Sequence, residues 1–264
     1  MPSDCQTRVH GKGRGMITLR NVHKAFGDHV VLDGIDFDVQ QGETVALLGP
    51  SGVGKSVLLK HINGLIAPDH GGVEVDGVSV PHLNRKELAG LRQRVGYVFQ
   101  YGALFDSMTV YDNVLLGITD ESCVNDVGYC AVRVIECLEL VNLSADVAAE
   151  YPAQISGGMK KRVGIARAIA GQPKYLLYDE PTSGLDPVNA EIIDSLLVKL
   201  QRELGVTSVS VTHDVRGAFK VADRIALLHD GKIHAFGTPE EMVASEDEAV
   251  QEFLERDLAD IVKH

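Results

Sequence analysis

Residues 49–56 read GPSGVGKS and combine glycines, a lysine and a serine at the spacing that binds a phosphate chain. The members of this stretch are Gly49, Pro50, Ser51, Gly52, Val53, Gly54, Lys55 and Ser56. Glycines let backbone N–H groups turn toward phosphate oxygens, the lysine reaches the β- and γ-phosphates, and the serine hydroxyl binds Mg²⁺. An ordinary glycine-rich turn is the alternative. The apolar run before the stretch and the helical pattern after it favour a nucleoside triphosphate site.

Two carboxylates, Asp179 and Glu180, stand at the end of the apolar run YLLY. A strand that ends beside the phosphate loop presents Asp179 to the metal, and Glu180 polarises a water for in-line attack on the γ-phosphate. A pair of solvated loop acids is the alternative. Together with the phosphate loop, the pair indicates hydrolysis of the bound nucleotide.

A third group of residues, Ser156, Gly157 and Gly158, opens a basic helical stretch. Small residues at a helix N-terminus leave backbone N–H groups free to hold an anion. The basic residues Lys160–Arg162 that follow are interpreted as a solvated helix face, with contact to the nucleotide or to a partner subunit as the alternative.

The elements that position these residues alternate along the chain. Apolar runs predict strands at 16–22, 36–39, 44–48, 95–99, 175–179 and 207–212, and a hairpin at 71–80 that turns at Asp76-Gly77. Helical patterns begin at Lys55 and occupy 131–141, 161–170 and 190–204. Buried strands that alternate with helices predict an α/β fold with a mainly parallel sheet, and the region from about 101 to 165 is predicted to be a helical insertion.

The composition excludes several classes of protein. The chain has 264 residues, is 45% hydrophobic and carries a formal net charge of −12, which disfavours nucleic acid as a partner. No run approaches the roughly 18 apolar residues that cross a bilayer. Residues 1–15 are expected to be a disordered tail rather than a signal peptide. Cys123, Cys130 and Cys137, spaced by seven, are expected to be reduced and buried.

The order of these motifs resembles that of ABC transporter nucleotide-binding subunits over roughly residues 17–240. GPSGVGKS is similar to the Walker A motif, YLLYDE to Walker B, ISGGM to the signature and SGLD, at 183–186, to the D-loop. Gln100 matches the Q-loop glutamine, His213 the switch histidine, and Phe26 takes the place of the aromatic residue that stacks on adenine. The resemblance implies a P-loop NTPase core of the ABC ATPase type, with an antiparallel β subdomain and an inserted α-helical subdomain.

The resemblance also implies roles for these residues. Glu180, His213 and Gln100 are expected to be catalytic, and Ser56, Gln100 and Asp179 to hold Mg²⁺. Two subunits are expected to close head to tail, so that each ATP lies between the Walker A motif of one and Ser156–Gly158 of the other. Covering the γ-phosphate with a second helix N-terminus excludes water from it.

Met159 stands where the family has glutamine, and a thioether donates no hydrogen bond. A methionine here, and the stretches 66–72 and 100–114, resemble ATPases of the Mla/Mce type, which power phospholipid transport between bacterial membranes and maintain outer-membrane lipid asymmetry. The alternatives are an importer of an amino acid or a metal, a non-transport ABC ATPase and a soluble P-loop kinase. The resemblance implies a peripheral position on the cytoplasmic face of the inner membrane. The implied partners are a second copy, an integral-membrane permease, a small accessory regulator and a lipid-binding substrate subunit.

The chain is therefore expected to comprise a tail at 1–15, an ATPase domain at 16–240 and a helical extension at 241–264. The extension has an apolar stripe formed by Val250, Phe253, Leu254, Leu258, Ile261 and Val262. We expect this stripe to pack against another subunit, and packing on its own domain is the alternative.

Overall fold

The computed structural model describes residues 16–118 and 127–258, with side chains as far as Leu254. The strands are β1 (Ile17–Phe26), β2 (His29–Val39), β3 (Thr44–Leu48), β4 (His70–Val75), β5 (Val78–Ser79), β6 (Val95–Val98), β7 (Tyr175–Asp179), β8 (Thr207–Val211), β9 (Arg224–His229) and β10 (Lys232–Gly237). The helices are α1 (Lys55–Ile62), α2 (Arg85–Gln93), α3 (Val110–Leu115), α5 (Val127–Leu140), α6 (Gly157–Ala170), α7 (Pro187–Leu204), α8 (Val215–Val221), α9 (Pro239–Val243) and α10 (Glu248–Leu258).

The larger sheet has six strands in the order β10-β9-β3-β8-β7-β6. Strands β9, β3, β8, β7 and β6 pair in parallel, and β10 pairs antiparallel to β9 at the edge. All five residues of β3 are buried, as expected for a strand that is covered on both faces. The mainly parallel sheet predicted from the sequence is confirmed. Its strands β9 and β10 were not predicted.

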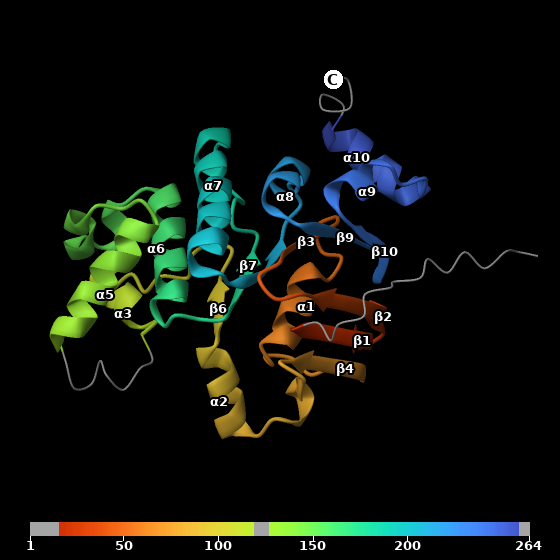
Figure 1. Cartoon of the computed structure of the whole chain (residues 1–264), viewed down its shortest axis with the longest axis horizontal. Coiled ribbons are helices and arrows are strands. Elements are labelled where there is room, and N and C mark those ends of the chain that lie inside the picture. The colour runs from red at the N-terminus through yellow and green to blue at the C-terminus, as the bar shows by residue number, and fades with distance from the viewer. Residues whose placement is uncertain (1–15, 119–126, 259–264) are drawn as a thin grey trace, which may run out of the picture.

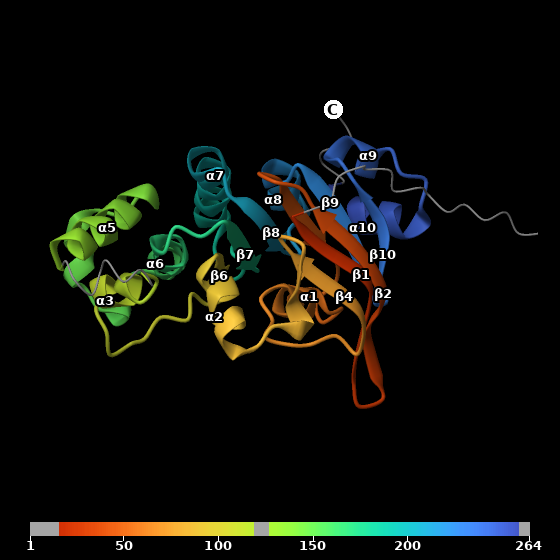
Figure 2. The ribbon, with the colours of Figure 1, turned by 60° about the horizontal axis from the view of Figure 1, so that its bottom comes forward.

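The smaller sheet is antiparallel, in the order β2-β1-β4-β5. Its β4–β5 hairpin pairs Val75 with Val78 and turns at Asp76 (φ 54°) and Gly77 (φ 73°), which confirms the predicted turn. Figure 2 shows α1 between this sheet and the larger one, and residues of both sheets and α1 share one core cluster. The start of α1 is thus anchored from two sides.

Asp76 joins the two sheets through its carboxylate. It accepts hydrogen bonds from Arg94 (2.7 Å), Lys174 (2.6 Å) and the Tyr175 hydroxyl (2.5 Å). The donors lie at the starts of β6 and β7, so the hairpin turn is tied to the end of these strands opposite to Asp179 and Glu180.

A helical part formed by α3, α5 and α6 lies at one end of the molecule (Figure 1) and has its own core cluster, which α7 also joins. Helix α6 begins at Gly157, capped by Ser156, as the signature pattern predicts, and α7 begins at Pro187, earlier than the predicted 190, because Asp186 caps it with a side-chain oxygen. Cys137 is free and buried, as expected. Cys130 is disulfide-bonded, so the expectation that it is reduced was wrong.

Helix α10 packs on its own domain. Val250 is fully buried and Leu254 is 5% exposed, in a cluster that includes Ala218 of α8 and Met242 of α9. The expectation that the stripe needs another subunit is wrong for these two residues, because α8 and α9 already cover them. Residues 259–264, with Ile261 and Val262, and the predicted tail at 1–15 lie outside the described residues.

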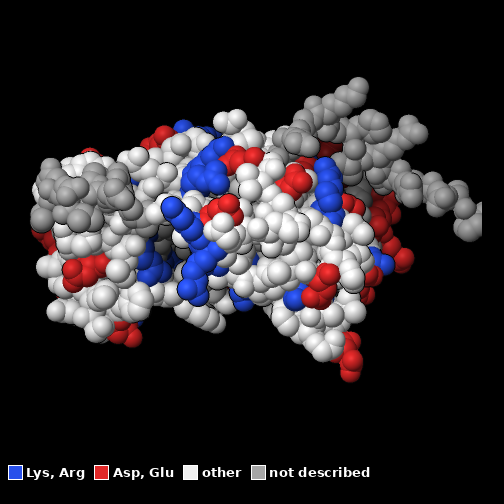
Figure 3. All heavy atoms as spheres, turned by 90° about the horizontal axis from the view of Figure 1, so that it is seen from below, with Lys and Arg blue, Asp and Glu red and all other residues white. Residues whose placement is uncertain are grey.

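Among the described residues, no helix combines the length and apolarity that a membrane span requires. The face seen in Figure 3 carries basic and acidic side chains in small separate groups on a mostly uncharged surface.

Candidate nucleotide site

The loop between β3 and α1 has a backbone that only glycine accepts at two points. Gly49 has φ 152°, and a Cβ there would overlap the carbonyl oxygen of Leu228. Gly54 has φ 107°, and its Cβ would lie 2.6 Å from Val31 Cγ1. These glycines let the loop curl before the helix starts at Lys55, which places the N–H groups of α1 at the loop.

Lys55 points back into this loop. Its Nζ donates to the carbonyl oxygens of Gly49 (2.7 Å) and Pro50 (3.0 Å) and lies 3.6 Å from Glu180 Oε1. Burial lowers the pKa of Lys55, and the nearby Glu180 carboxylate opposes that shift. A triphosphate in the loop offers this amine charged oxygens in place of neutral carbonyls, which favours binding.

Ser56 and Asp179 come together as predicted, from α1 and the end of β7. The Ser56 hydroxyl donates to Asp179 Oδ1 at 2.6 Å, and the Tyr97 hydroxyl donates to Asp179 Oδ2 at 2.9 Å. Burial and the Asp179 charge raise the pKa of Tyr97, so its hydroxyl stays a donor. A hydroxyl and a carboxylate are the hard oxygen ligands that Mg²⁺ takes beside nucleotide phosphates, so this pair fits the ion.

Glu180 is the residue after β7, and its backbone is in the left-handed region with φ 52°. Its N–H donates to Val211 O at 2.9 Å, and its side chain is held between Lys55 and His213. His213 Nδ1 lies 2.7 Å from Glu180 Oε2, which is hydrogen-bond distance. The predicted base and the switch histidine are thus in direct contact.

Gln100 lies at the side of this cluster. Its Nε2 donates to the Ser183 hydroxyl at 3.3 Å, so in this structure it contacts the D-loop rather than Ser56 or Asp179. Its assignment to the metal site stays a prediction.

The signature residues open α6, where Ser156 and Gly157 are exposed and Gly158 is buried. Ser156 caps the helix by accepting from Met159 N at 3.3 Å, and around Gly157 there is open space. Gly158 is packed on the first turn of α7, because a Cβ there would lie 2.8 Å from Asn189 Oδ1. The side chain of Met159 packs against the core cluster of the helical part, so this position contributes to folding and not to a polar contact.

In Figures 1 and 2, α6 and α1 lie on different sides of β6 and β7. Phe26, at the end of β1, is 50% exposed and has Lys24 Nζ 5.4 Å from its ring centroid. An exposed ring at this place is available for stacking.

Two residues of the site, Tyr97 and Lys161, were not predicted from the sequence. Tyr97 was hidden inside an apolar strand pattern, and only the register Tyr97↔Leu177 of β6 and β7 shows that its hydroxyl reaches the end of β7. Lys161 was taken for a solvated residue, but it is 5% exposed and donates to Glu180 O at 3.2 Å. Arg162 donates instead to Asn142 O at 2.7 Å.

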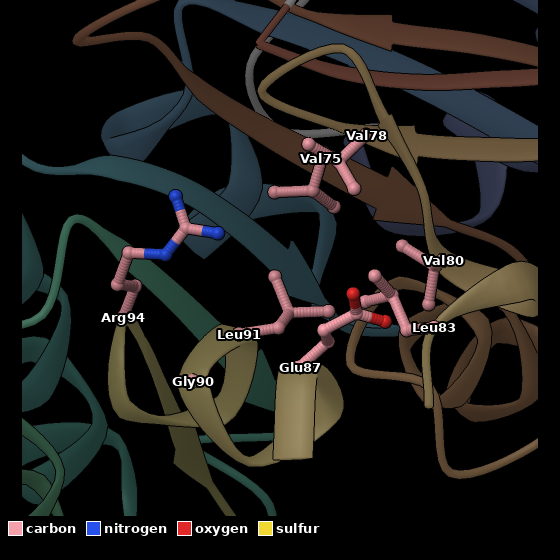
Figure 4. Close-up of a pocket in the computed structure, with 8 residues that line it drawn as sticks. All are labelled: Val75, Val78, Val80, Leu83, Glu87, Gly90, Leu91 and Arg94. Atoms are coloured by element: carbon pink, nitrogen blue, oxygen red, sulfur yellow. The ribbon is translucent and has the colours of Figure 1, made fainter. Parts of the chain in front are cut away.

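A separate apolar groove of about 360 Å³ lies between the β4–β5 hairpin and α2. Figure 4 shows Val75 facing Leu91 across it, with Glu87 and Arg94 at its borders. None of the predicted site residues lines this groove.

Comparison with known proteins agrees with this geometry. The family model described as ABC transporter matches residues 32–183. The methionine import ATP-binding protein MetN of Carboxydothermus hydrogenoformans is 43% identical over 83% of this chain and 65% of its own length. The intermembrane phospholipid transport system ATP-binding protein MlaF of Haemophilus influenzae is 37% identical over 91% of this chain and 90% of its own length. A dimeric post-hydrolysis structure of the ATP-binding cassette MJ0796 with ADP and Pi has a TM-score of 0.74 and 35% identity, over 84% of this chain and 98% of that one.

Proposed function

We propose, from the premise that this chain belongs to the ABC transporter family, that it is the ATPase subunit of a phospholipid transporter. As a member of that family it binds and hydrolyses ATP. The observation that carries the catalytic assignment is the cluster of Lys55, Ser56, Asp179, Glu180 and His213 around the phosphate loop.

In the proposed reaction, Glu180 accepts a proton from the water that attacks the γ-phosphate, and His213 holds the Glu180 carboxylate toward that water. Lys55 and the N–H groups of the loop balance the charge that develops on the phosphate oxygens. Ser56 and Asp179 hold Mg²⁺, which neutralises charge on the β- and γ-phosphates when bound. Gln100 takes part in this reaction from the loop after β6.

The working unit in this proposal is a homodimer. Ser156 and Gly157 are exposed at the start of α6, so this helix end is available to the ATP of a second copy. The dimeric cassette MJ0796 is similar over most of this chain. A head-to-tail pair covers each γ-phosphate from both sides and excludes water from it.

Phospholipid is proposed as the cargo for two reasons. The MlaF relative aligns over more of this chain than the MetN relative does, 91% against 83%. The signature carries Met159, as the sequence resemblance to Mla/Mce ATPases expects. The same proposal includes an integral-membrane permease, a small accessory regulator and a lipid-binding subunit, with this chain at the cytoplasmic face of the inner membrane.

An importer of a small solute is the second candidate, because MetN is 43% identical. Purification of the assembly from native membranes in mild detergent separates the two. We expect an integral-membrane subunit, co-purified phospholipid and ATP hydrolysis that phospholipid stimulates. An assembly whose ATP hydrolysis responds to methionine or sulfate and not to phospholipid contradicts the proposed cargo.

A further inference from the structure

Lys161 is a buried lysine on α6. The sequence pattern predicts that its stretch, Lys160–Arg162, is a solvated helix face. The residue exposure of Lys161 is 5%, whereas its neighbours Lys160 and Arg162 are half-buried. Removing an ammonium group from water is costly, so a lysine in this place needs a specific acceptor.

The acceptor is the backbone of the proposed catalytic base. Lys161 Nζ donates to Glu180 O at 3.2 Å, and Ser183 N donates to the same oxygen at 3.2 Å. Glu180 has φ 52°, a conformation that costs a non-glycine residue on the order of 1–3 kcal/mol and persists only where the surroundings hold it. The lysine is one of the groups that hold it.

The amine also lies in the field of the Glu180 carboxylate. Burial lowers the pKa of Lys161, and the Glu180 charge opposes that shift. Glu180 is thus contacted by two lysines, Lys55 at its carboxylate and Lys161 at its carbonyl oxygen.

Helix α6 is a firm support for this contact. Gly164 is packed against Gly102, because a Cβ at Gly164 would lie 3.1 Å from Gly102 Cα. Arg167 of the same helix donates to Gly102 O and Ala103 O, at 2.7 Å each. The helix that carries Lys161 therefore has little freedom to move relative to the loop after β6.

We propose that Lys161 is a positioning residue, which fixes the backbone of Glu180 from the signature helix and so sets the angle at which the carboxylate meets the attacking water. The inference rests on the proposed function of Glu180. It also means that the helix that covers the partner's ATP holds the base of its own subunit's site.

The test is Lys161→Met, which keeps the length of the side chain and removes the donor, with Lys160→Met as the matched control. We expect kcat to fall about tenfold or more, because a shift of a catalytic group by 1 Å can cost about a hundredfold. KM for ATP should stay within about twofold, since Lys161 does not contact the phosphate loop. Lys161→Gln, which keeps a donor, should retain more turnover than Lys161→Met, and Lys160→Met should match the unmutated protein.

A second readout separates this role from a structural one. If Lys161 acts through Glu180, Lys161→Met should accumulate the ATP-bound dimer, as Glu180→Gln does, with an unchanged melting temperature. Turnover within about twofold of the unmutated protein overturns the proposal, and so does failure of the variant to form the ATP dimer, because Lys161 would then serve the signature. The proposed function of Glu180 is tested separately. If it is wrong, Glu180→Gln itself should keep full turnover.

Discussion

At the scale of single residues, the proposed chemistry depends on one buried carboxylate, that of Glu180. Glu180 is 8% exposed, with Lys55 Nζ 3.6 Å from its Oε1 and His213 Nδ1 2.7 Å from its Oε2. Lys55 comes from the start of α1 and His213 from the loop after β8, so the proposed base depends on contacts that form only in the folded chain.

Glu180→Gln keeps the shape of this side chain and removes the base. We expect turnover to fall by about a hundredfold or more, with ATP affinity retained because the phosphate loop is unchanged. Lys55→Ala is the contrasting variant, since it removes the charge at the phosphates and should weaken ATP binding itself. Fluorescent-nucleotide binding beside steady-state ATP hydrolysis measures both effects. Turnover of Glu180→Gln within a few-fold of the unmutated protein contradicts the assignment.

Tyr97 tests the proposed Mg²⁺ site. Tyr97→Phe removes one of the two donors to Asp179 and leaves the Ser56 hydroxyl in place. We expect the Mg²⁺ concentration that gives half-maximal ATP hydrolysis to rise roughly tenfold. Loss of a residue that orients a metal ligand lowers metal affinity or activity by about 10- to 100-fold, and tenfold is the lower end of that range. Tyr111→Phe, in the helical part, is the control and should leave the Mg²⁺ titration unchanged. If Tyr97→Phe also leaves the Mg²⁺ titration unchanged, the prediction is wrong, because Asp179 then needs no second donor.

The sequence predicted the phosphate loop, the carboxylates and the histidine because each belongs to a short motif. It did not predict the roles of Tyr97 or Lys161. Their contacts depend on the register of β6 against β7 and on the face that α6 turns inward, and neither is encoded in a local pattern.

At the scale of elements, α7 and α8 meet at a buried carboxylate. Asp194 of α7 is 6% exposed, and burial, with a further contribution from Asp214, raises its pKa to about 6. Lys220 opposes this shift and Glu191 adds to it. The folded state therefore binds a proton between about pH 4 and pH 6 that the unfolded state has released, so stability falls as pH rises through this window.

Asp194→Asn should remove this pH dependence. We expect the variant to gain up to about 3 kcal/mol of unfolding free energy at pH 7, the value of a two-unit shift, and to gain little at pH 4. Urea unfolding at both pH values measures it. Glu203→Gln, at the exposed end of α7, is the control and should change stability by less than about 0.5 kcal/mol. A gain that is equal at both pH values contradicts the explanation.

Helix α10 belongs to the core of its own chain. Leu254→Ala should lower the unfolding free energy by about 2–5 kcal/mol, because it leaves a cavity against α8 and α9. Val243→Ala, at a 45% exposed position of α9, should have little effect. Thermal unfolding of the monomer reports both. If the Leu254→Ala monomer stays stable but no longer associates with a partner, this explanation is wrong and the apolar stripe forms an interface.

Some strands and helices were predicted from the sequence and others were not, and the difference has a physical cause. Buried runs such as β3 were predicted because parallel strands are apolar throughout. Strand β9 also has four consecutive buried residues, Ile225–Leu228, but it was not predicted. The packing of α10 depends on the surfaces of α8 and α9, and the sequence of α10 alone does not specify those surfaces.

At the scale of the whole molecule, one chain holds two halves of different sites. Helix α1, which follows the phosphate loop, and helix α6, which begins at the signature, lie on different sides of β6 and β7 in Figures 1 and 2. Neither half covers the γ-phosphate alone, so our account requires two copies and makes ATP the ligand that joins them.

The most direct test of this claim is the mass of Glu180→Gln in solution with Mg²⁺ and ATP, measured by light scattering during size-exclusion chromatography. Our account predicts a species of twice the 28.5 kDa of one chain with ATP, and a monomer with ADP. Adding Ser156→Arg to the same chain should leave ATP binding intact and abolish the dimer. A protein that stays monomeric with ATP, or a Ser156→Arg variant that dimerises as well as its parent, would contradict the shared site.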